Sequence, residues 1–249
     1  MGRDERLFRV PFRSWGSCMM KVCGLQKLTL LDYPEKVACT VFTGGCNLRC
    51  PFCQNASLVI GTPGADDVSD EELFAYLNKR RGLLDGVCVT GGEPLLQPGL
   101  ADFLRRIRTL GYSIKLDTNG CFPDSLRELV AQGLVDYVAM DLKSSPQHYA
   151  QAVGVADFDF SVIRRSIDFL LAGPVDYEFR TTVVRGLHNR GILRDAALEI
   201  RGAKRYFLQK FVDSGDLIGT GLSAFSDSEM EEFLKAVSPY VKTAALRGV

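Results

Sequence analysis

The chain has 249 residues, of which 46% are hydrophobic and 24% charged, a composition typical of globular domains and not of disordered chains. Thirty basic residues balance thirty acidic ones, so a bulk electrostatic attraction to nucleic acid or to an anionic membrane is not expected. The longest mainly apolar runs, such as 37–42, fall far short of the ~20 residues that a membrane-spanning helix needs.

The first ten residues hold three arginines and no apolar segment, which excludes a secretory signal peptide. We expect residues 1–19 to be a disordered extension and residues 20–249 to form a single domain. Without an export signal, the expected location is the cytoplasm, where thiols stay reduced. The eight cysteines are therefore interpreted as thiols or metal ligands and not as a disulfide framework.

From residue 37 onward, short runs rich in β-branched residues alternate with helical patterns. A capping box at Ser69 and Glu72 predicts a helix that runs to about Arg81. Apolar residues at helical spacing predict two further helices, over 100–110 and 163–171. The predicted strands are 37–43, 86–90, 113–117, 137–141, 177–184 and 205–210, with a further candidate near 241–245.

This alternation predicts an α/β fold with right-handed βαβ units and a parallel sheet. Six strands are fewer than the eight of a closed barrel, so an open or partial barrel is expected. In such architectures the chemistry lies at the carboxyl ends of the strands.

Three cysteines follow the first predicted strand in the pattern C-x3-C-x2-C: Cys46, Cys50 and Cys53. A structural zinc site needs four ligands, whereas three thiolates can hold three irons of a [4Fe–4S] cube and leave the fourth iron open for a substrate. The alternative is a zinc knuckle whose fourth ligand comes from elsewhere in the chain, and the candidates are Cys88, Cys121, His148 and His188.

The triplet, with aromatic Phe52 before its last cysteine, resembles the cluster loop of the radical S-adenosylmethionine (radical SAM) superfamily. The run 91–94, Gly-Gly-Glu-Pro, resembles the family loop that meets the amino group of the cofactor's methionine moiety. The runs 117–120 and 141–143 resemble motifs of glycyl-radical-enzyme activases, and residues 25–55 are most similar to the activating proteins of anaerobic ribonucleoside-triphosphate reductases.

The resemblance implies a partial (β/α)6 barrel of the radical SAM type, a [4Fe–4S] cluster and S-adenosylmethionine as cofactors. It implies reductive cleavage of S-adenosylmethionine and abstraction of a hydrogen atom from a glycine of a partner, an anaerobic ribonucleotide reductase or another glycyl radical enzyme. A flavodoxin or ferredoxin is the expected electron donor. Neither nucleic acid nor a membrane is an expected partner.

The resemblance also implies the site residues. The cluster ligands, catalytic through the cluster, are Cys46, Cys50 and Cys53. The cofactor-binding residues are Phe52, Gly91, Gly92, Glu93, Asp117, Thr118, Asn119, Asp141, Lys143 and Arg180. Oxygen donors at strand ends, Asp117, Thr118 and Asp141, are the candidates for a monovalent or other hard-cation site near the cofactor carboxylate.

Several of these residues also have simpler interpretations. The two glycines could form a tight turn, with Pro94 opening the next helix. Asp141 and Lys143 could be a surface ion pair worth at most about 1 kcal/mol. Phe52 could fill the core, and both histidines could be ordinary surface or loop residues. Three cysteines are expected to pack as small hydrophobic residues: Cys39, Cys88 and Cys121.

Two other functions remain open from the sequence. One is a radical SAM enzyme that acts on a small molecule or nucleoside. The other is a zinc-binding interaction module without catalysis, which a colourless protein with stoichiometric zinc would indicate.

Overall fold

The computed structural model describes residues 20–60 and 67–249, so the predicted extension over 1–19 lies outside the described residues. Eight strands, β1 to β8, follow one another in the sheet in chain order. The chain divides into two compact units. Among the described residues, the first comprises 20–47, 57–60 and 67–115 and the second comprises 48–56 and 116–249, so the division falls within strand β4 (Ser113–Thr118).

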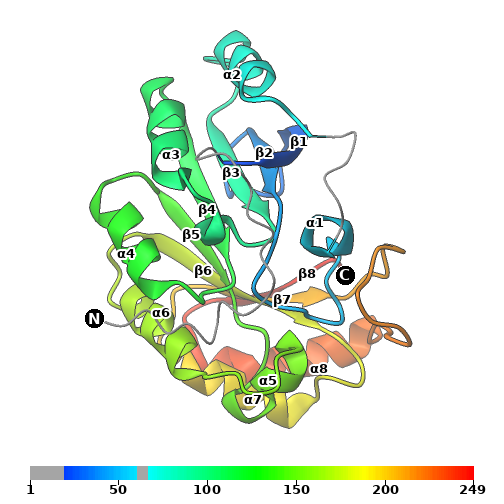
Figure 1. Ribbon diagram of the computed structural model, residues 1–249. Helices are drawn as coiled ribbons and strands as arrows, with labels where there is room; N and C mark the ends of the chain where they lie inside the picture. The colour runs from blue at the N-terminus through cyan, green and yellow to red at the C-terminus, as the bar shows by residue number, and fades with distance from the viewer. Residues whose placement is uncertain (1–19, 61–66) are drawn as a thin grey trace. The chain divides into compact units, whose positions relative to one another are not determined.

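The first unit begins with an antiparallel pair, β1 (Val22–Thr29) and β2 (Ala38–Thr43), and β3 (Gly86–Gly91) runs parallel to β2 (Figure 1). Its helices are α1 (Ala56–Ile60), α2 (Asp70–Lys79), the 3₁₀ helix η2 (Pro94–Leu96) and α3 (Leu100–Thr109). Helices α2 and α3 are joined by an edge-to-face contact between Phe74 and Phe103, whose ring centroids lie 5.7 Å apart.

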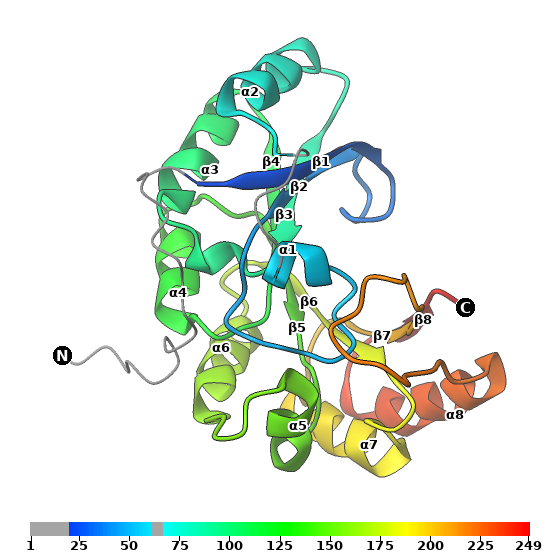
Figure 2. The same ribbon diagram turned by 45° about the vertical axis from the view of Figure 1, so that its right-hand side comes forward.

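The second unit carries the parallel strands β5 (Tyr137–Asp141), β6 (Asp176–Val183), β7 (Tyr206–Lys210) and β8 (Ala244–Arg247). Its helices are α4 (Pro123–Ala131), η3 (Pro146–His148), α5 (Tyr149–Val153), α6 (Ser161–Leu171), α7 (Arg190–Glu199), α8 (Asp227–Val237) and η4 (Ser238–Tyr240). Helices α7 and α8 lie side by side, as both views show (Figures 1 and 2).

The α/β fold with its parallel strands confirms the predicted partial barrel. The six predicted strands correspond to β2 to β7 with ends shifted by no more than one residue, and the further candidate is β8, displaced toward the C-terminus. The capping box at Ser69 and Glu72 is present at the start of α2. The two helices predicted over 100–110 and 163–171 are α3 and α6, whose buried residues repeat at helical spacing.

Strand β1 was not among the predicted strands. Its pairing with β2 has two register irregularities, and three consecutive residues near its end are exposed. Both features interrupt the alternation of buried and exposed side chains that identifies a strand in a sequence.

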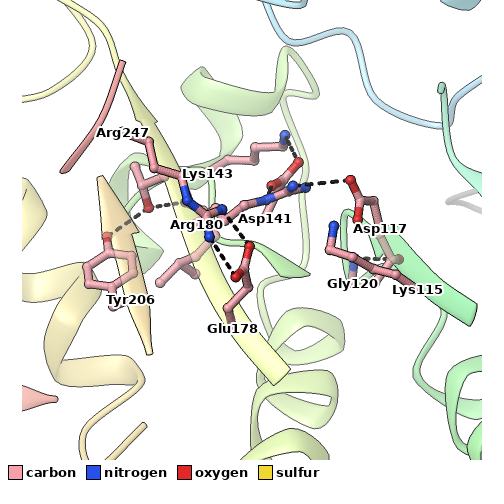
Figure 3. Close-up of polar contacts among 12 residues, drawn as sticks. Lys115, Asp117, Gly120, Asp141, Lys143, Glu178, Arg180, Tyr206 and Arg247 are labelled. Atoms are coloured by element: carbon pink, nitrogen blue, oxygen red, sulfur yellow. Dashed lines mark hydrogen bonds and ion pairs between the residues drawn. The ribbon is translucent and has the colours of Figure 1, made fainter. Parts of the chain in front are cut away.

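A buried ion pair fastens the last strand. Glu178 of β6 is fully buried, and both of its carboxylate oxygens accept hydrogen bonds from Arg247 of β8, at 2.6 and 2.8 Å. The Tyr137 hydroxyl donates to the same carboxylate at 2.7 Å. Because a buried carboxylate needs such partners, these bonds hold β8 against the sheet (Figure 3). Within residues 20–60 and 67–249, no helix has the length and apolar character needed to cross a membrane.

Candidate active site

In the first unit, the segment before Cys46 is held by hydrogen bonds that its three consecutive carbonyl groups accept. The backbone N–H groups of Gly92 and Glu93 donate to the carbonyls of Thr43 and Gly45, at 2.9 and 2.8 Å. The side-chain amide of Gln97 donates to the carbonyl of the residue between them at 2.5 Å. Strand β3 and the turn after it therefore fix the conformation of the chain that leads into the cysteine loop.

Both glycines of the turn are required by this close approach. A Cβ atom on Gly92 would lie 1.9 Å from the carbonyl oxygen of Gly45. Gly91 has a φ of 118°, and a Cβ there would lie 2.3 Å from the backbone of Thr43. The two glycines therefore form a tight turn, as one interpretation predicted, and this turn brings two backbone segments together.

Glu93 is fully buried and caps η2, where its Oε1 accepts a hydrogen bond from the Leu95 N–H at 3.1 Å. Pro94 opens the next helix, as predicted, and that helix is the single 3₁₀ turn η2; α3 starts at Leu100. The contact of Glu93 with a cofactor amino group stays a prediction.

Gln97 was missed at the sequence level. It is 9% exposed, and its Oε1 accepts from the backbone N–H of Lys21 at 3.4 Å while its Nε2 holds the loop. A lone glutamine after a Gly-Gly-Glu motif carries no sequence signal, because its role depends on two distant backbone groups.

We expect Gln97→Leu to lower the free energy of unfolding by about 1–3 kcal/mol, the cost of an unsatisfied buried carbonyl. It should also reduce the iron that the protein retains after anaerobic reconstitution and desalting. The matched control is Gln26→Leu in β1, where an exposed amide donates to Leu28. Equal iron retention in both variants would show that Gln97 does not position the loop.

The second half of the cysteine loop is anchored within the second unit. Arg49 donates its N–H to the carbonyl of Val153 at 2.9 Å, and Gly219 donates to the carbonyl of Pro51 at 2.7 Å. A Cβ on Gly154 would lie 2.3 Å from the Arg49 carbonyl oxygen. The loop is therefore built from backbone contacts and contains no regular secondary structure between residues 44 and 55.

Cys50 lies in this half and is buried. Burial raises the pKa of its thiol to about 11, against the opposing charge of Lys143. A thiolate at this position therefore needs further positive charge, and metal ions supply it by deprotonating a thiol outright. Burial lowers the pKa of the Lys143 ammonium, but the Asp141 carboxylate and, after it, Cys50 and Cys53 raise that pKa, and the net shift is upward.

The three cysteines fit the cluster by their chemistry. All seven cysteines among the described residues lack disulfides, and three of them lie within eight residues on one irregular loop. Cys46 belongs to the first unit, whereas Cys50 and Cys53 belong to the second. No group of three or more His, Cys, Asp or Glu side chains in the described ranges is arranged to hold a metal ion, so the assignment rests on the donor set.

Two of the candidate fourth ligands of a zinc knuckle are cysteines of the protein interior. Cys88 lies inside β3 and Cys121 precedes α4, and both are buried, as is Cys39 in β2. Their burial confirms the prediction that these three residues pack as small hydrophobic side chains.

Four charged side chains converge in the second unit (Figure 3). Arg180 donates from Nε to Asp141 at 2.9 Å and from Nη1 to Asp117 at 3.1 Å. Lys143 donates from Nζ to Asp141 at 2.9 Å. Burial alone would raise the pKa of Asp141, but Arg180 and Lys143 outweigh it and hold that pKa at about 2. Asp141 therefore stays ionised.

The surface-pair interpretation of Asp141 and Lys143 is wrong, because their side chains are only 27% and 17% exposed. Arg180, a single charge within β6, has both carboxylates as partners. Strands β4, β5 and β6 supply Asp117, Asp141 and Arg180 from their carboxyl-terminal halves, and Lys143 follows the end of β5, where the chemistry of a parallel α/β fold is expected.

Thr118 and Asn119 are buried and support the turn after β4. The Thr118 hydroxyl accepts from the Gly120 N–H at 3.1 Å, and the Asn119 side-chain oxygen accepts from the Cys121 N–H at 2.9 Å. Side chains of this kind fold back on the backbone in turns. Their cofactor contacts stay predictions.

His188 was predicted to be a surface or loop residue. It lies in a loop, but the loop is not at the surface there, since His188 is only 4% exposed. Its Nδ1 accepts from the Val184 N–H at 3.0 Å, and its Nε2 donates to the Lys143 carbonyl at 2.9 Å. Burial lowers the pKa of its imidazole, so the ring is neutral and holds the backbone of Lys143. His148, in contrast, is exposed as predicted.

Phe52 is buried in the second unit, with its ring edge toward His188 at 6.3 Å between centroids and the Lys143 ammonium 6.0 Å from its ring centre. This burial agrees with the core-filling interpretation. Contact with the adenine of a cofactor stays a prediction.

Comparison with known proteins places these features in a family. The model of the radical SAM superfamily matches residues 40–198. A protein of Methanocaldococcus jannaschii, named provisionally as a glycyl-radical enzyme activating enzyme, is 29% identical over 234 residues, which are 92% of this chain and 96% of that protein. A 7-carboxy-7-deazaguanine synthase of Koribacter versatilis is 31% identical over 150 residues, 58% of this chain and 62% of that enzyme.

The fold is also found among solved structures. A domain of the pyruvate-formate lyase-activating enzyme from Bacteroides vulgatus superposes with a TM-score of 0.54 at 20% identity, over 66% of this chain and 99% of that domain. This similarity supports the fold alone. Since the family model covers more than half of the sequence and includes the cysteine triplet, the chain belongs to the radical SAM superfamily, which implies S-adenosylmethionine and a [4Fe–4S] cluster as its cofactors.

Proposed function

We propose that the protein is an activase that reductively cleaves S-adenosylmethionine and abstracts a hydrogen atom from a glycine of a glycyl radical enzyme. An anaerobic ribonucleotide reductase is the first partner to test, because residues 25–55 are most similar to the activating proteins of those reductases. The observation that carries the proposal is the near full-length similarity to the Methanocaldococcus jannaschii protein.

In this proposal Cys46, Cys50 and Cys53 hold three irons of the cluster. When bound, the cluster supplies the electron that breaks the sulfonium C–S bond of the cofactor, whose adenosyl part then removes the hydrogen atom. The protein contributes binding, orientation and exclusion of water. The backbone contacts on each half of the cysteine loop would serve this purpose, because on each half they hold the main chain next to a cysteine.

The remaining residues would bind the cofactor. Glu93, as a buried carboxylate next to two glycines, suits the cofactor's amino group. Lys143 and Arg180 are cations and suit its carboxylate. Because Asp141 stays ionised and bonds both of them, it would keep the two cations charged and oriented. Phe52 would pack against the adenine.

The test is the formation of the protein radical. Reconstituted protein, S-adenosylmethionine, a reductant and a candidate glycyl radical enzyme are mixed without oxygen and examined by electron paramagnetic resonance. We expect a glycyl doublet with anaerobic ribonucleotide reductase and none when the acceptor glycine is replaced by alanine. Replacing the chemical reductant by a flavodoxin or a ferredoxin tests the proposed electron donors.

A second candidate is a reaction on a small molecule, favoured by the similarity to the Koribacter versatilis enzyme. Cofactor cleavage without a doublet for every glycyl radical enzyme tried would support it. The relative named for that reaction matches little more than half of this chain, which is why the activase is preferred.

A further inference from the structure

The carboxylates that the resemblance assigns to a hard cation already have cationic partners within the chain. Both oxygens of Asp141 are used, since Oδ1 accepts from Arg180 Nε and Oδ2 accepts from Lys143 Nζ, each at 2.9 Å. Asp117 accepts from Arg180 Nη1 through Oδ2 at 3.1 Å (Figure 3). One guanidinium therefore bridges the two carboxylates.

The sheet itself places this guanidinium. Asp141 and Arg180 are directly paired residues of the parallel strands β5 and β6, and the Leu142 N–H donates to the Arg180 carbonyl at 2.8 Å. The side chains of Arg180 and Asp117 are only 13% and 12% exposed. Strand register therefore places the Asp141 half of the bridge, and the low exposure of Arg180 and Asp117 shows that the other half does not depend on an exposed surface side chain.

The charges around this bridge disfavour a metal cation. Two carboxylates already face two permanent positive charges, so a metal ion would add a third positive charge in direct contact with them. Hard cations also need several oxygen ligands, and here both Asp141 oxygens and Asp117 Oδ2 already accept hydrogen bonds from Lys143 and Arg180.

We propose that Arg180 takes the place of the metal cation: it bridges Asp117 and Asp141, orients the carboxylate that holds Lys143, and lets S-adenosylmethionine bind without any metal cation at this position. Arginine suits the role because its guanidinium is always charged and presents several donors in a fixed plane. The inference concerns cofactor binding and rests on membership of the superfamily, so it does not depend on which substrate receives the radical.

The first test measures the dissociation constant of S-adenosylmethionine by anaerobic calorimetry on reconstituted protein. The buffers contain sodium, potassium or tetramethylammonium as the only cation, at equal ionic strength. We expect the three values to agree within about twofold. A dissociation constant at least about tenfold weaker in tetramethylammonium would overturn the proposal, because a small metal cation would then take part in binding.

The second test removes the bridge. With Arg180→Met, two carboxylates lose their shared partner, and we expect binding that is about tenfold tighter in sodium or potassium than in tetramethylammonium. Sodium-23 resonances should broaden with this variant and not with the unaltered protein. Arg180→Lys keeps one positive charge and is expected to show an intermediate dependence.

Circular dichroism establishes whether each variant is folded. If Arg180→Met does not fold, the dependence of cofactor binding on the buffer cation is decided by Arg180→Lys and the unaltered protein. Cofactor binding that is equal in all three buffers for a folded Arg180→Met would contradict the proposal. So would broadening of the sodium resonance by the unaltered protein.

Discussion

Replacing any one of Cys46, Cys50 or Cys53 by alanine is expected to abolish cleavage of S-adenosylmethionine. Each thiolate would hold one iron of the cluster, and a cube with only two protein ligands has too few to retain its form and its single open iron. The fold should persist, because the loop is anchored by backbone contacts such as those of Arg49 with Val153 and Gly219 with Pro51, which no thiol makes.

The measurement is the release of 5′-deoxyadenosine under dithionite, together with iron content and the thermal unfolding curve. Cys39→Ala is the matched control, since Cys39 is a fully buried thiol of β2 in the sheet core. We expect this control to keep its iron and its turnover. Retained cleavage in any of the three loop variants would refute the assignment of that cysteine as a ligand.

The second large effect is expected from Gly92→Ala. Its new methyl group would lie 1.9 Å from the Gly45 carbonyl oxygen, and this neighbour is backbone that cannot rotate aside. We expect the free energy of unfolding to fall by about 3 kcal/mol or more, at the upper end of overpacking effects. Because the displaced carbonyl lies directly before Cys46, iron retention should fall as well.

Gly24→Ala is the control for this substitution. It also lies in the first unit, and a Cβ there would be 3.6 Å from Phe42, in ordinary van der Waals contact. We expect its free energy of unfolding to change by less than about 1 kcal/mol and its iron content not to change. A Gly92→Ala protein as stable and as iron-rich as this control would contradict the close approach of the two segments.

Much of the fold was predictable because its strands are regular and buried. Several of the strands β2 to β7 are nearly continuous apolar runs, and amphipathic helices separate them along the chain, so the alternation is a strong signal. Strand β1 escaped because its ladder is irregular and partly exposed. No local pattern identifies such a strand, since its position is decided by the partner, β2.

The candidate site was predictable only where a motif carries it. The cysteine triplet and the Gly-Gly-Glu turn are local in the sequence. The roles of Gln97 and His188 are not, because each acts by bonding the backbone of a residue more than forty positions away. Likewise, one charge in a largely apolar strand does not reveal its partners: the pairing of Arg180 with Asp141 follows from the register of β5 and β6, and its bond to Asp117 joins residues 63 positions apart.

The claim that Cys46, Cys50 and Cys53 hold a [4Fe–4S] cluster is tested most directly by iron and sulfide analysis, with absorption spectra. The protein is purified without oxygen and reconstituted with ferrous iron and sulfide. We expect about four irons and four sulfides per chain and a brown protein with broad absorption near about 400 nm that fades on reduction. The Cys46, Cys50 and Cys53 variants should lose the iron, the sulfide and the absorption. A colourless protein that carries stoichiometric zinc, or iron that remains in those variants, would contradict it.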